Sequence, residues 1–202
     1  NILESNINSN NIQSYVGLGH TRWATHGGKT DNNSHPHISN NKNIILVHNG
    51  IINNYETLKA MLLDNNYNFY SETDTEVIAN LIEYYILNMN YNIEDAINET
   101  INKLEGTWAL VIIYTKDLDT YYVTRHGSPL LLGTNDNYTI VTSEINGFIA
   151  LINDYISINN HDIIKINNNN YNSIKQNEYL IKHVPYDSLV DLSNNKHWMH
   201  KE

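Results

Sequence analysis

The hydrophobic period of the sequence changes at Gly106, and this change limits the folds that the chain can adopt. Before Gly106, apolar residues recur every three or four positions over 54–63, 73–88 and 93–104, which predicts three helices. After it come short apolar runs separated by turn residues, a pattern typical of strands. Helices in the middle of the chain with strands on both sides predict an α+β fold of mainly antiparallel sheets.

The other expected elements are short. Strands are predicted over residues 14–20, 43–48, 107–114, 121–125, 130–133, 138–142, 162–166 and 179–184, with a turn over 167–172 and a short helix near 144–151. The first thirteen residues and the residues from Pro185 onward are polar, so we expect a ragged end and a tail or linker there. The length of 202 residues predicts one domain with at most a small appendage.

The composition excludes several classes of function. The sequence contains no Cys, which rules out thiolate zinc sites, iron–sulfur clusters and a Cys nucleophile within these residues. The formal net charge of −10 argues against a nucleic-acid partner, because phosphate backbones bind to basic surfaces. No apolar run approaches the roughly 20 residues that span a bilayer. We therefore expect no membrane partner and a cytoplasmic location.

The segment 20–27 reads HTRWATHG and contains Arg22, one of only two arginines in the chain. Arginine offers a planar fork of N–H donors that matches a carboxylate, and Thr25 and His26 add donors nearby. The segment therefore indicates a site for a carboxylate. The alternative is a surface arginine that packs on the ring of Trp23 through a cation–π contact.

The segment 47–52 reads VHNGII and places Asn49 and Gly50 at the end of a predicted buried strand. An Asn-Gly pair in that position is usually a tight turn, and the pair taken alone favours this interpretation. The functional alternative is an oxyanion hole. In that arrangement the Asn49 amide and the Gly50 backbone N–H both donate to an oxygen that becomes negative during a reaction.

The segment 71–76 reads SETDTE and lies where a helix is predicted to begin. Thr73 followed by Glu76 is a capping-box pattern, which explains both residues without any functional role. Asp74 is left open by capping. An acid fixed in a rigid first turn can hold an ammonium group, so Asp74 is a candidate binding residue.

Histidines are concentrated between His20 and His48, and the sequence His35-Pro36-His37 could suggest a metal site. Its spacing matches no standard zinc pattern, and no acidic residue repeats with it. We therefore expect neither a metal nor a cofactor. The segment Arg125-His126-Gly127-Ser128 reads as an ordinary turn between strands.

Six segments in this order, HTRWATHG, HPH, VHNGIINN, SETDTEV, GTWAL and GSPL, resemble the glutaminase domain of glutamine–fructose-6-phosphate aminotransferases (isomerizing), the glucosamine-6-phosphate synthase family. The resemblance begins near Gly19 and weakens after Gly147. It implies a type 2 glutamine amidotransferase with the N-terminal-nucleophile hydrolase fold, a four-layer α/β/β/α sandwich of two mainly antiparallel sheets. It also implies a homo-oligomeric enzyme that hydrolyses glutamine and channels the ammonia to fructose 6-phosphate on sugar-isomerase domains of the same chain.

The resemblance implies roles for individual residues. Arg22 would clamp the α-carboxylate of glutamine, and Asp74 would hold its α-ammonium group. Asn49 and Gly50 would form the oxyanion hole. The remaining residues belong to loops that close over the site: Thr25, His26 and His35, with Trp23 as the gate of the ammonia channel.

The sequence departs from the family at its nucleophile. The family uses an N-terminal Cys whose own α-amino group acts as the base, whereas this chain has no Cys and opens with Asn1. The family's first segment of roughly fifty residues, long enough for several ordinary strands, is also missing. We therefore expect residues 1–202 to form a glutaminase domain that is incomplete at its N-terminus. Residues 185–202 would begin the linker to absent sugar-isomerase domains.

The chain alone is accordingly expected to be inactive, and two further interpretations stay open. One is a non-catalytic module that binds glutamine or glutamate, which Arg22 and Asp74 alone could support. The other is a different glutamine amidotransferase, such as an amidophosphoribosyltransferase.

Overall fold

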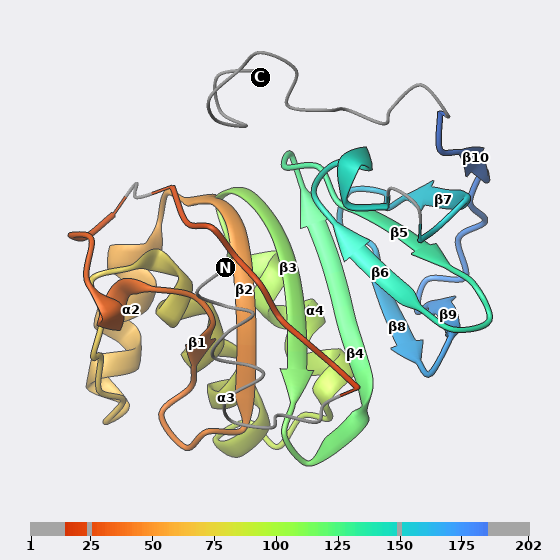
Figure 1. Cartoon of the computed structure of the whole chain (residues 1–202). Helices are drawn as coiled ribbons and strands as arrows, with labels where there is room; N and C mark the ends of the chain where they lie inside the picture. The colour runs from red at the N-terminus through yellow and green to blue at the C-terminus, as the bar shows by residue number, and fades with distance from the viewer. Residues whose placement is uncertain (1–14, 24–25, 149–150, 186–202) are drawn as a thin grey trace.

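The computed structural model describes residues 15–23, 26–148 and 151–185 (Figure 1). Within this part of the chain a six-stranded sheet carries three α-helices on one face and a four-stranded sheet on the other. The predicted α+β fold is therefore confirmed. Of the four layers that the resemblance implies, one helical layer and both sheets lie among the described residues.

Each element is short or of ordinary length. The first sheet contains β1 (His37–Ile38), β2 (Ile44–Ile52), β3 (Gly106–Tyr114), β4 (Asp117–His126), β8 (Ile163–Asn167) and β9 (Asn170–Ser173). The second sheet contains β5 (Leu131–Thr134), β6 (Thr139–Thr142), β7 (Asp154–Ser157) and β10 (Lys182–His183). The helices are α2 (Tyr55–Asp64), α3 (Asp74–Leu87) and α4 (Ile93–Lys103), with 3₁₀ turns η1 (Asp31–Asn33) and η2 (Ile145–Phe148).

The strand order is β1-β2-β3-β4-β8-β9 in the first sheet and β10-β7-β5-β6 in the second. Neighbouring strands in both sheets run antiparallel. The nine residues of β2 pair along their whole length with β3, from Ile44 opposite Tyr114 to Ile52 opposite Gly106. This long central pair forms the rigid base on which the candidate site is built.

Alternation along β3 produces two separate cores. Leu110 and Ile112 face the helices and pack with Ile78 of α3, whereas Ala109 faces the second sheet and packs with Leu132 of β5. Side chains that alternate across a strand reach both faces of its sheet, so one apolar strand can serve two cores. The first sheet is therefore covered by apolar groups on both sides.

Glu83 of α3 fastens the hairpin between β1 and β2 to the helix. Its fully buried carboxylate accepts bonds from Ser39 Oγ (2.7 Å), from the backbone N–H groups of Asn41 (2.9 Å) and Asn43 (3.2 Å), and from the amides of both asparagines (3.1 and 2.9 Å). Burying a carboxylate is costly unless donors surround it. The contacts explain why a charged residue is tolerated inside this helix.

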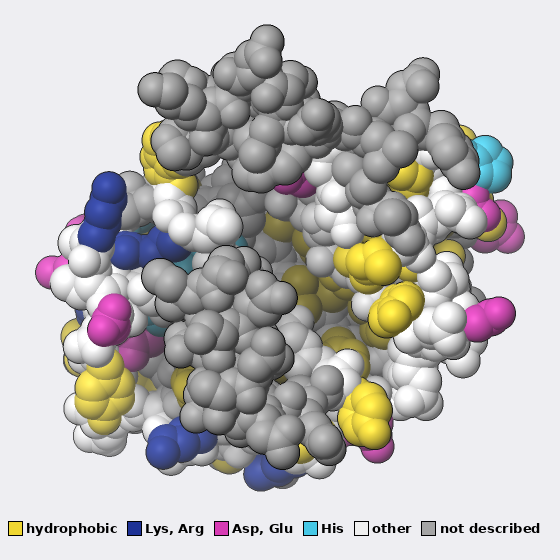
Figure 2. All heavy atoms as spheres, in the orientation of Figure 1, with side chains coloured by type: hydrophobic (Ala, Val, Ile, Leu, Met, Phe, Trp, Pro, Cys, Tyr) yellow, Lys and Arg dark blue, Asp and Glu magenta, His cyan; other side chains and the backbone are white. Residues whose placement is uncertain are grey.

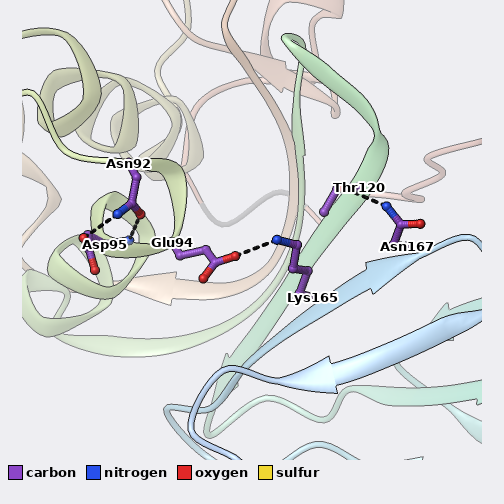
Figure 3. A network of polar contacts seen from close by, with 6 residues as sticks. All are labelled: Asn92, Glu94, Asp95, Thr120, Lys165 and Asn167. Carbon is purple, nitrogen blue, oxygen red and sulfur yellow. Dashed lines mark hydrogen bonds and ion pairs between the residues drawn. The ribbon is translucent and has the colours of Figure 1, made fainter.

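A polar network joins α4 to the sheet (Figure 3). Asn92 caps the helix by accepting from the backbone N–H of Asp95 at 2.9 Å. Lys165 of β8 lies 2.8 Å from Glu94, and Asn167 donates to Thr120 of β4 at 3.2 Å. The ion pair is partly exposed and so contributes about 0–1 kcal/mol. Of these contacts, only the one between Glu94 and Lys165 joins α4 to the sheet.

Several expectations about short elements were wrong. Residues 15–20 are not a strand, and the helix expected near 144–151 is only the 3₁₀ turn η2. The tract 167–172 is a hairpin rather than a turn alone. Its two-residue loop has Asn168 at φ 51°, and β9 follows directly because Asn tolerates this left-handed conformation. The strands β1 and β7 were not predicted, and the last strand shrinks to Lys182–His183.

None of the helices in the described residues is long and apolar enough to cross a membrane. The linker predicted over 185–202 lies outside the described residues, except for Pro185.

Candidate functional site

A cavity of about 250 Å³ lies where β2 meets the start of α3, beneath the loop that carries Arg22. Its lining brings together most of the residues predicted to act: Arg22, Trp23, His26, His35, Asn49, Gly50 and Asp74. Thr25 lies outside the described residues. Segments separated by dozens of positions therefore converge on one site.

Arg22 lies along the wall of the cavity with its backbone in the left-handed region, at φ 47°. Its Nη1 donates to the carbonyl oxygen of Gly28 at 2.8 Å, and its Nη2 donates to those of His26 (2.8 Å) and Gly27 (3.4 Å). A guanidinium carries five N–H donors, so these bonds leave two for a ligand. The loop carbonyls, rather than the ring of the exposed Trp23, orient the guanidinium.

Asn49 and Gly50 lie inside β2, so the tight turn favoured by the residue pair alone is wrong. Asn49 is exposed and stands opposite Ala109 of β3. Gly50 has φ 147°, and a Cβ there would lie 2.1 Å from the carbonyl oxygen of Thr107. Only glycine fits that approach. The backbone is therefore distorted at the position proposed for the oxyanion hole.

Asp74 is the first residue of α3 and is 4% exposed. Its Oδ2 accepts from the backbone N–H of Ile52 at 2.8 Å, which fixes the carboxylate against the end of β2. The Thr75 hydroxyl also donates to Oδ1 at 3.4 Å. A carboxylate with these two donors keeps lone pairs for another cation or donor. Asp74 is therefore well placed to bind an ammonium group.

The capping box is confirmed in one half. Thr73 Oγ1 accepts from the backbone N–H of Glu76 at 3.4 Å, as predicted. The Glu76 carboxylate reaches further back and accepts from the N–H groups of Tyr70 (2.9 Å) and Ser71 (2.7 Å). These bonds fix the turn before α3, and they thereby also fix the position of Asp74, which follows the turn directly.

The histidines of this region pack ring against ring, with His20 stacked on His35 and His37 edge-on to His35. The rings of His20 and His35 are 4.1 Å apart, and those of His35 and His37 are 4.9 Å apart. Burial is the main cause that lowers the pKa of His35 to about 3, and neighbouring His20, His37 and His48 lower it further. Within the described residues no group of three His, Cys, Asp or Glu side chains could hold a metal.

Sequence reasoning assigned no role to the side chains that support Asn49 and Gly50. Buried His48 contacts Thr75 Oγ1 through Nδ1 at 3.0 Å and the carbonyl oxygen of Thr107 through Nε2 at 3.3 Å. It thereby joins β2, β3 and α3 beside Gly50. Burial lowers the pKa of His48, which keeps the imidazole neutral. The only feature of the sequence that could have indicated this supporting role is the position of His48 directly before Asn49.

His26 lines the cavity and carries a buried ring nitrogen without a partner in the part of the chain that the structure describes. Its Nδ1 is buried and has no hydrogen-bond partner among the described residues, while its ring packs edge-on against Tyr55 at 4.8 Å. A buried ring nitrogen without a partner is costly, so this contact is a weak point of the loop.

A larger groove of about 670 Å³ lies between the two sheets and meets the cavity at His20 and Asn49. Its lining includes Val111 of β3, Val141 of β6 and Leu130. Figure 2 shows apolar side chains on the floor of the hollow between the two halves of the molecule. The site therefore opens toward the second sheet through a groove that both apolar and polar side chains line.

Comparison with known proteins agrees with this geometry. The family described as a glutamine amidotransferase domain matches residues 20–150. The glutamine–fructose-6-phosphate aminotransferase (isomerizing) of Staphylococcus aureus (strain Mu50) is 40% identical over 174 residues, covering 86% of this chain and 27% of that protein. The corresponding protein of Caldanaerobacter subterraneus subsp. tengcongensis is 39% identical over 163 residues, with coverages of 81% and 26%.

Solved structures support the same fold. Glutamine phosphoribosylpyrophosphate amidotransferase from B. subtilis matches with a TM-score of 0.63 at 26% identity, over 76% of this chain and 33% of that chain. A glutamine aminotransferase class-II domain protein from Silicibacter pomeroyi shares the fold at 16% identity and a TM-score of 0.53, over 69% of each chain.

The chain therefore belongs to the glutamine amidotransferase domain family and has the N-terminal-nucleophile type of fold. It resembles glutamine–fructose-6-phosphate aminotransferases in sequence over most of its length. It spans about a quarter of the length of those curated relatives.

Proposed function

We propose that this chain is the glutaminase part of a glutamine–fructose-6-phosphate aminotransferase (isomerizing) and that its cavity binds L-glutamine. The observation that carries the proposal is the convergence of three unlike groups on one cavity. Arg22 offers N–H donors for an α-carboxylate, Asp74 offers a negative charge for an α-ammonium, and Asn49 with Gly50 offers amide donors for the side-chain carbonyl.

The proposed chemistry is acyl transfer. A nucleophile attacks the carboxamide carbon of glutamine, and the carbonyl electrons move to the oxygen, which Asn49 Nδ2 and the Gly50 N–H stabilise. In the attack the proton of the nucleophile passes to a base, which in the family is the α-amino group of the nucleophilic residue. Collapse of the intermediate then breaks the C–N bond, and the leaving nitrogen takes that proton and departs as ammonia. Water then hydrolyses the acyl-enzyme to glutamate. The loop residues Thr25, His26 and His35 would exclude bulk water during these steps.

The nucleophile must come from outside these residues, since they contain no Cys. We propose that a segment with the family's N-terminal Cys lies in the groove between the sheets, because this groove reaches Asn49. Among the described strands, β6 lies at the end of its sheet and lines the groove, so an added strand could pair with it.

The rest of the parent enzyme is proposed by the same reasoning. Residues 185–202 would lead to sugar-isomerase domains that bind fructose 6-phosphate, in a homo-oligomer located in the cytoplasm. Trp23 is 76% exposed at the mouth of the cavity, where a gate for ammonia would stand. The proposal for the rest of the enzyme rests on the 40% identity with the glutamine–fructose-6-phosphate aminotransferase.

Two competing functions have weaker support. An amidophosphoribosyltransferase is a neighbour in structure at 26% identity, below the 40% identity of the aminotransferases. A non-catalytic glutamine-binding module needs only Arg22 and Asp74. The flanking gene sequence separates these possibilities, because each predicts a different partner segment.

Ligand titration followed by NMR tests the proposed binding. We expect the purified chain to bind L-glutamine and to bind D-glutamine more weakly. Arg22→Lys should weaken L-glutamine binding by about tenfold or more, because a charge-assisted hydrogen bond contributes about 1.5–3 kcal/mol. Arg125→Lys is the matched control, since Arg125 bonds to the carbonyls of Ile158 and Gly127 instead of lining the cavity. Equal affinity in both variants would remove Arg22 from the site.

A further inference from the structure

The loop that orients Arg22 is tied to the turn before α3 by two side chains, Asn33 and Glu72. Glu72 Oε2 accepts from the backbone N–H of Gly28 at 3.1 Å and from Asn33 Nδ2 at 2.9 Å. Asn33 also donates to the Gly28 carbonyl at 3.0 Å and accepts from the Glu72 N–H at 2.9 Å. The four bonds form a closed network across 39 positions of sequence.

We propose that Asn33 and Glu72 are positioning residues that set the distance between the two ends of an amino-acid clamp, Arg22 and Asp74. The proposal rests on the proposed binding of L-glutamine in the cavity. It concerns the affinity for L-glutamine and the orientation of Arg22 and Asp74; Asn33 and Glu72 themselves do not contact the ligand in this proposal.

The network reaches Arg22 through a single atom. The carbonyl oxygen of Gly28 accepts both from Arg22 Nη1 at 2.8 Å and from Asn33 Nδ2. A carbonyl held by Asn33 therefore holds the guanidinium as well. Loss of Asn33 or Glu72 would let Gly28, and with it Arg22, move relative to the cavity wall.

The network reaches Asp74 through the chain itself. Glu72 lies two residues before Asp74, and Thr73 between them caps α3. Asp74 is fixed in turn by the N–H of Ile52. One end of the tether is therefore attached to the capped start of α3, and the other end to the loop that carries Gly28.

Packing shows that the tether fits closely. Asn33 is 2% exposed although it lies in a three-residue 3₁₀ turn. Gly27 has φ 73°, and a Cβ there would lie 2.7 Å from Asn33 Nδ2 and 2.8 Å from Glu72 Cβ. The loop backbone thus lies directly against both tether side chains. This contact explains why only glycine suits position 27.

The carboxylate of Glu72 is suited to this role. Its hydrogen bonds from Asn33 and from the Gly28 N–H lower the pKa of Glu72, so the charged acceptor persists at neutral pH. The chain uses an acceptor that cannot also act as a donor toward Gly28 or Asn33.

The test compares ligands that use both ends of the clamp with ligands that use one. L-glutamine has both groups, glutaramate lacks the α-ammonium, and 4-aminobutanamide lacks the α-carboxylate. NMR titration of the purified chain measures all three affinities, including weak ones. Glu72→Ala, Asn33→Ala and Glu72→Gln are compared with wild type, and Glu178→Gln serves as control because Glu178 is exposed and outside the cavity.

We expect Glu72→Ala and Asn33→Ala to weaken the binding of L-glutamine by about tenfold or more. Two contacts to one ligand reinforce each other only while the distance between them is fixed. Each one-ended ligand should change by less than about threefold. Glu72→Gln should retain part of the affinity, since its amide oxygen can still accept.

Other outcomes would overturn the proposal. Equal weakening of all three ligands indicates general damage to the site, and unchanged L-glutamine affinity shows that the tether does not matter. If the wild-type chain binds no L-glutamine, the proposed function fails, and this proposal fails with it. If the wild-type chain binds L-glutamine and the variants bind it equally well, only the positioning role of Asn33 and Glu72 is refuted.

Discussion

The substitution Gly50→Ala tests whether the backbone at the candidate oxyanion hole is as constrained as the structure indicates. An added Cβ would lie 2.1 Å from the Thr107 carbonyl oxygen, 2.7 Å from its carbon and 2.9 Å from His48 Nε2. The first two atoms belong to the backbone of β3 and cannot turn aside. The φ of 147° also lies where residues other than glycine are strained.

The magnitude follows from these two effects. A non-glycine residue in such a conformation costs about 1–3 kcal/mol. Separating β2 from β3 near Thr107 would also weaken nearby backbone hydrogen bonds, each worth about 1 kcal/mol. We therefore expect a loss of about 3 kcal/mol in the free energy of unfolding. For a domain of this size that corresponds to a fall of about 6–12 °C in Tm.

Thermal and denaturant unfolding of the purified variant measure this loss. Gly17→Ala is the matched control, because its Cβ would meet no atom within 4 Å and its φ is not positive. Gly17→Ala should stay within about 0.5 kcal/mol of wild type, as surface changes usually do. A Gly50→Ala variant within 1 kcal/mol of wild type would show that β2 relaxes easily there, and would refute the reasoning.

Three further predictions follow from the same geometry. Glu83→Ala should lower the free energy of unfolding by at least about 3 kcal/mol. Ser39 Oγ and two buried donors of Asn43 would lose their acceptor, and each loss costs about 1–3 kcal/mol. A denaturant melt close to that of the wild type would contradict this. Because the pKa of His35 falls from 6.5 to about 3 on folding, the unfolded chain binds more protons between these values, so stability is complete above about pH 6.5 and declines below it. By pH 5.5 the decline should be about 1 kcal/mol, and His35→Asn should reduce it in melts across pH. The purified chain should release no ammonia from glutamine, and turnover above a mock preparation would reveal a nucleophile other than Cys.

The sequence predicted the helices and central strands well, because their apolar periods are long and regular. The helices over 54–63, 73–88 and 93–104 match α2, α3 and α4 within a residue or so at each end. Short strands were predicted less well. β1 has two residues and is stabilised by pairing with β2, a contact that its own sequence does not encode.

Sequence alone singled out candidate site residues where a residue type has few other uses. Arg22 was singled out because arginine is rare in this chain, and Asp74 because capping did not explain it; both line the cavity. The Asn49-Gly50 pair was ambiguous, since a turn and a distorted strand both use glycine. Asn33 and Glu72 were not recognised, because their contact spans 39 positions and polar residues in loops are common.

The alternation of β2 explains how one strand can both support and form the site. His48 points to the helical face, where Thr75 and the Thr107 carbonyl hold it, and the next residue, Asn49, points to the opposite face. Asn49 lines both the cavity and the groove, whereas Arg22 and Asp74 line only the cavity. Glutamine in the cavity and the nucleophile in the groove would therefore reach the Asn49 side chain from different sides. In the proposed reaction this separation allows glutamine to be held by its α-substituents while the groove remains free for the attacking group.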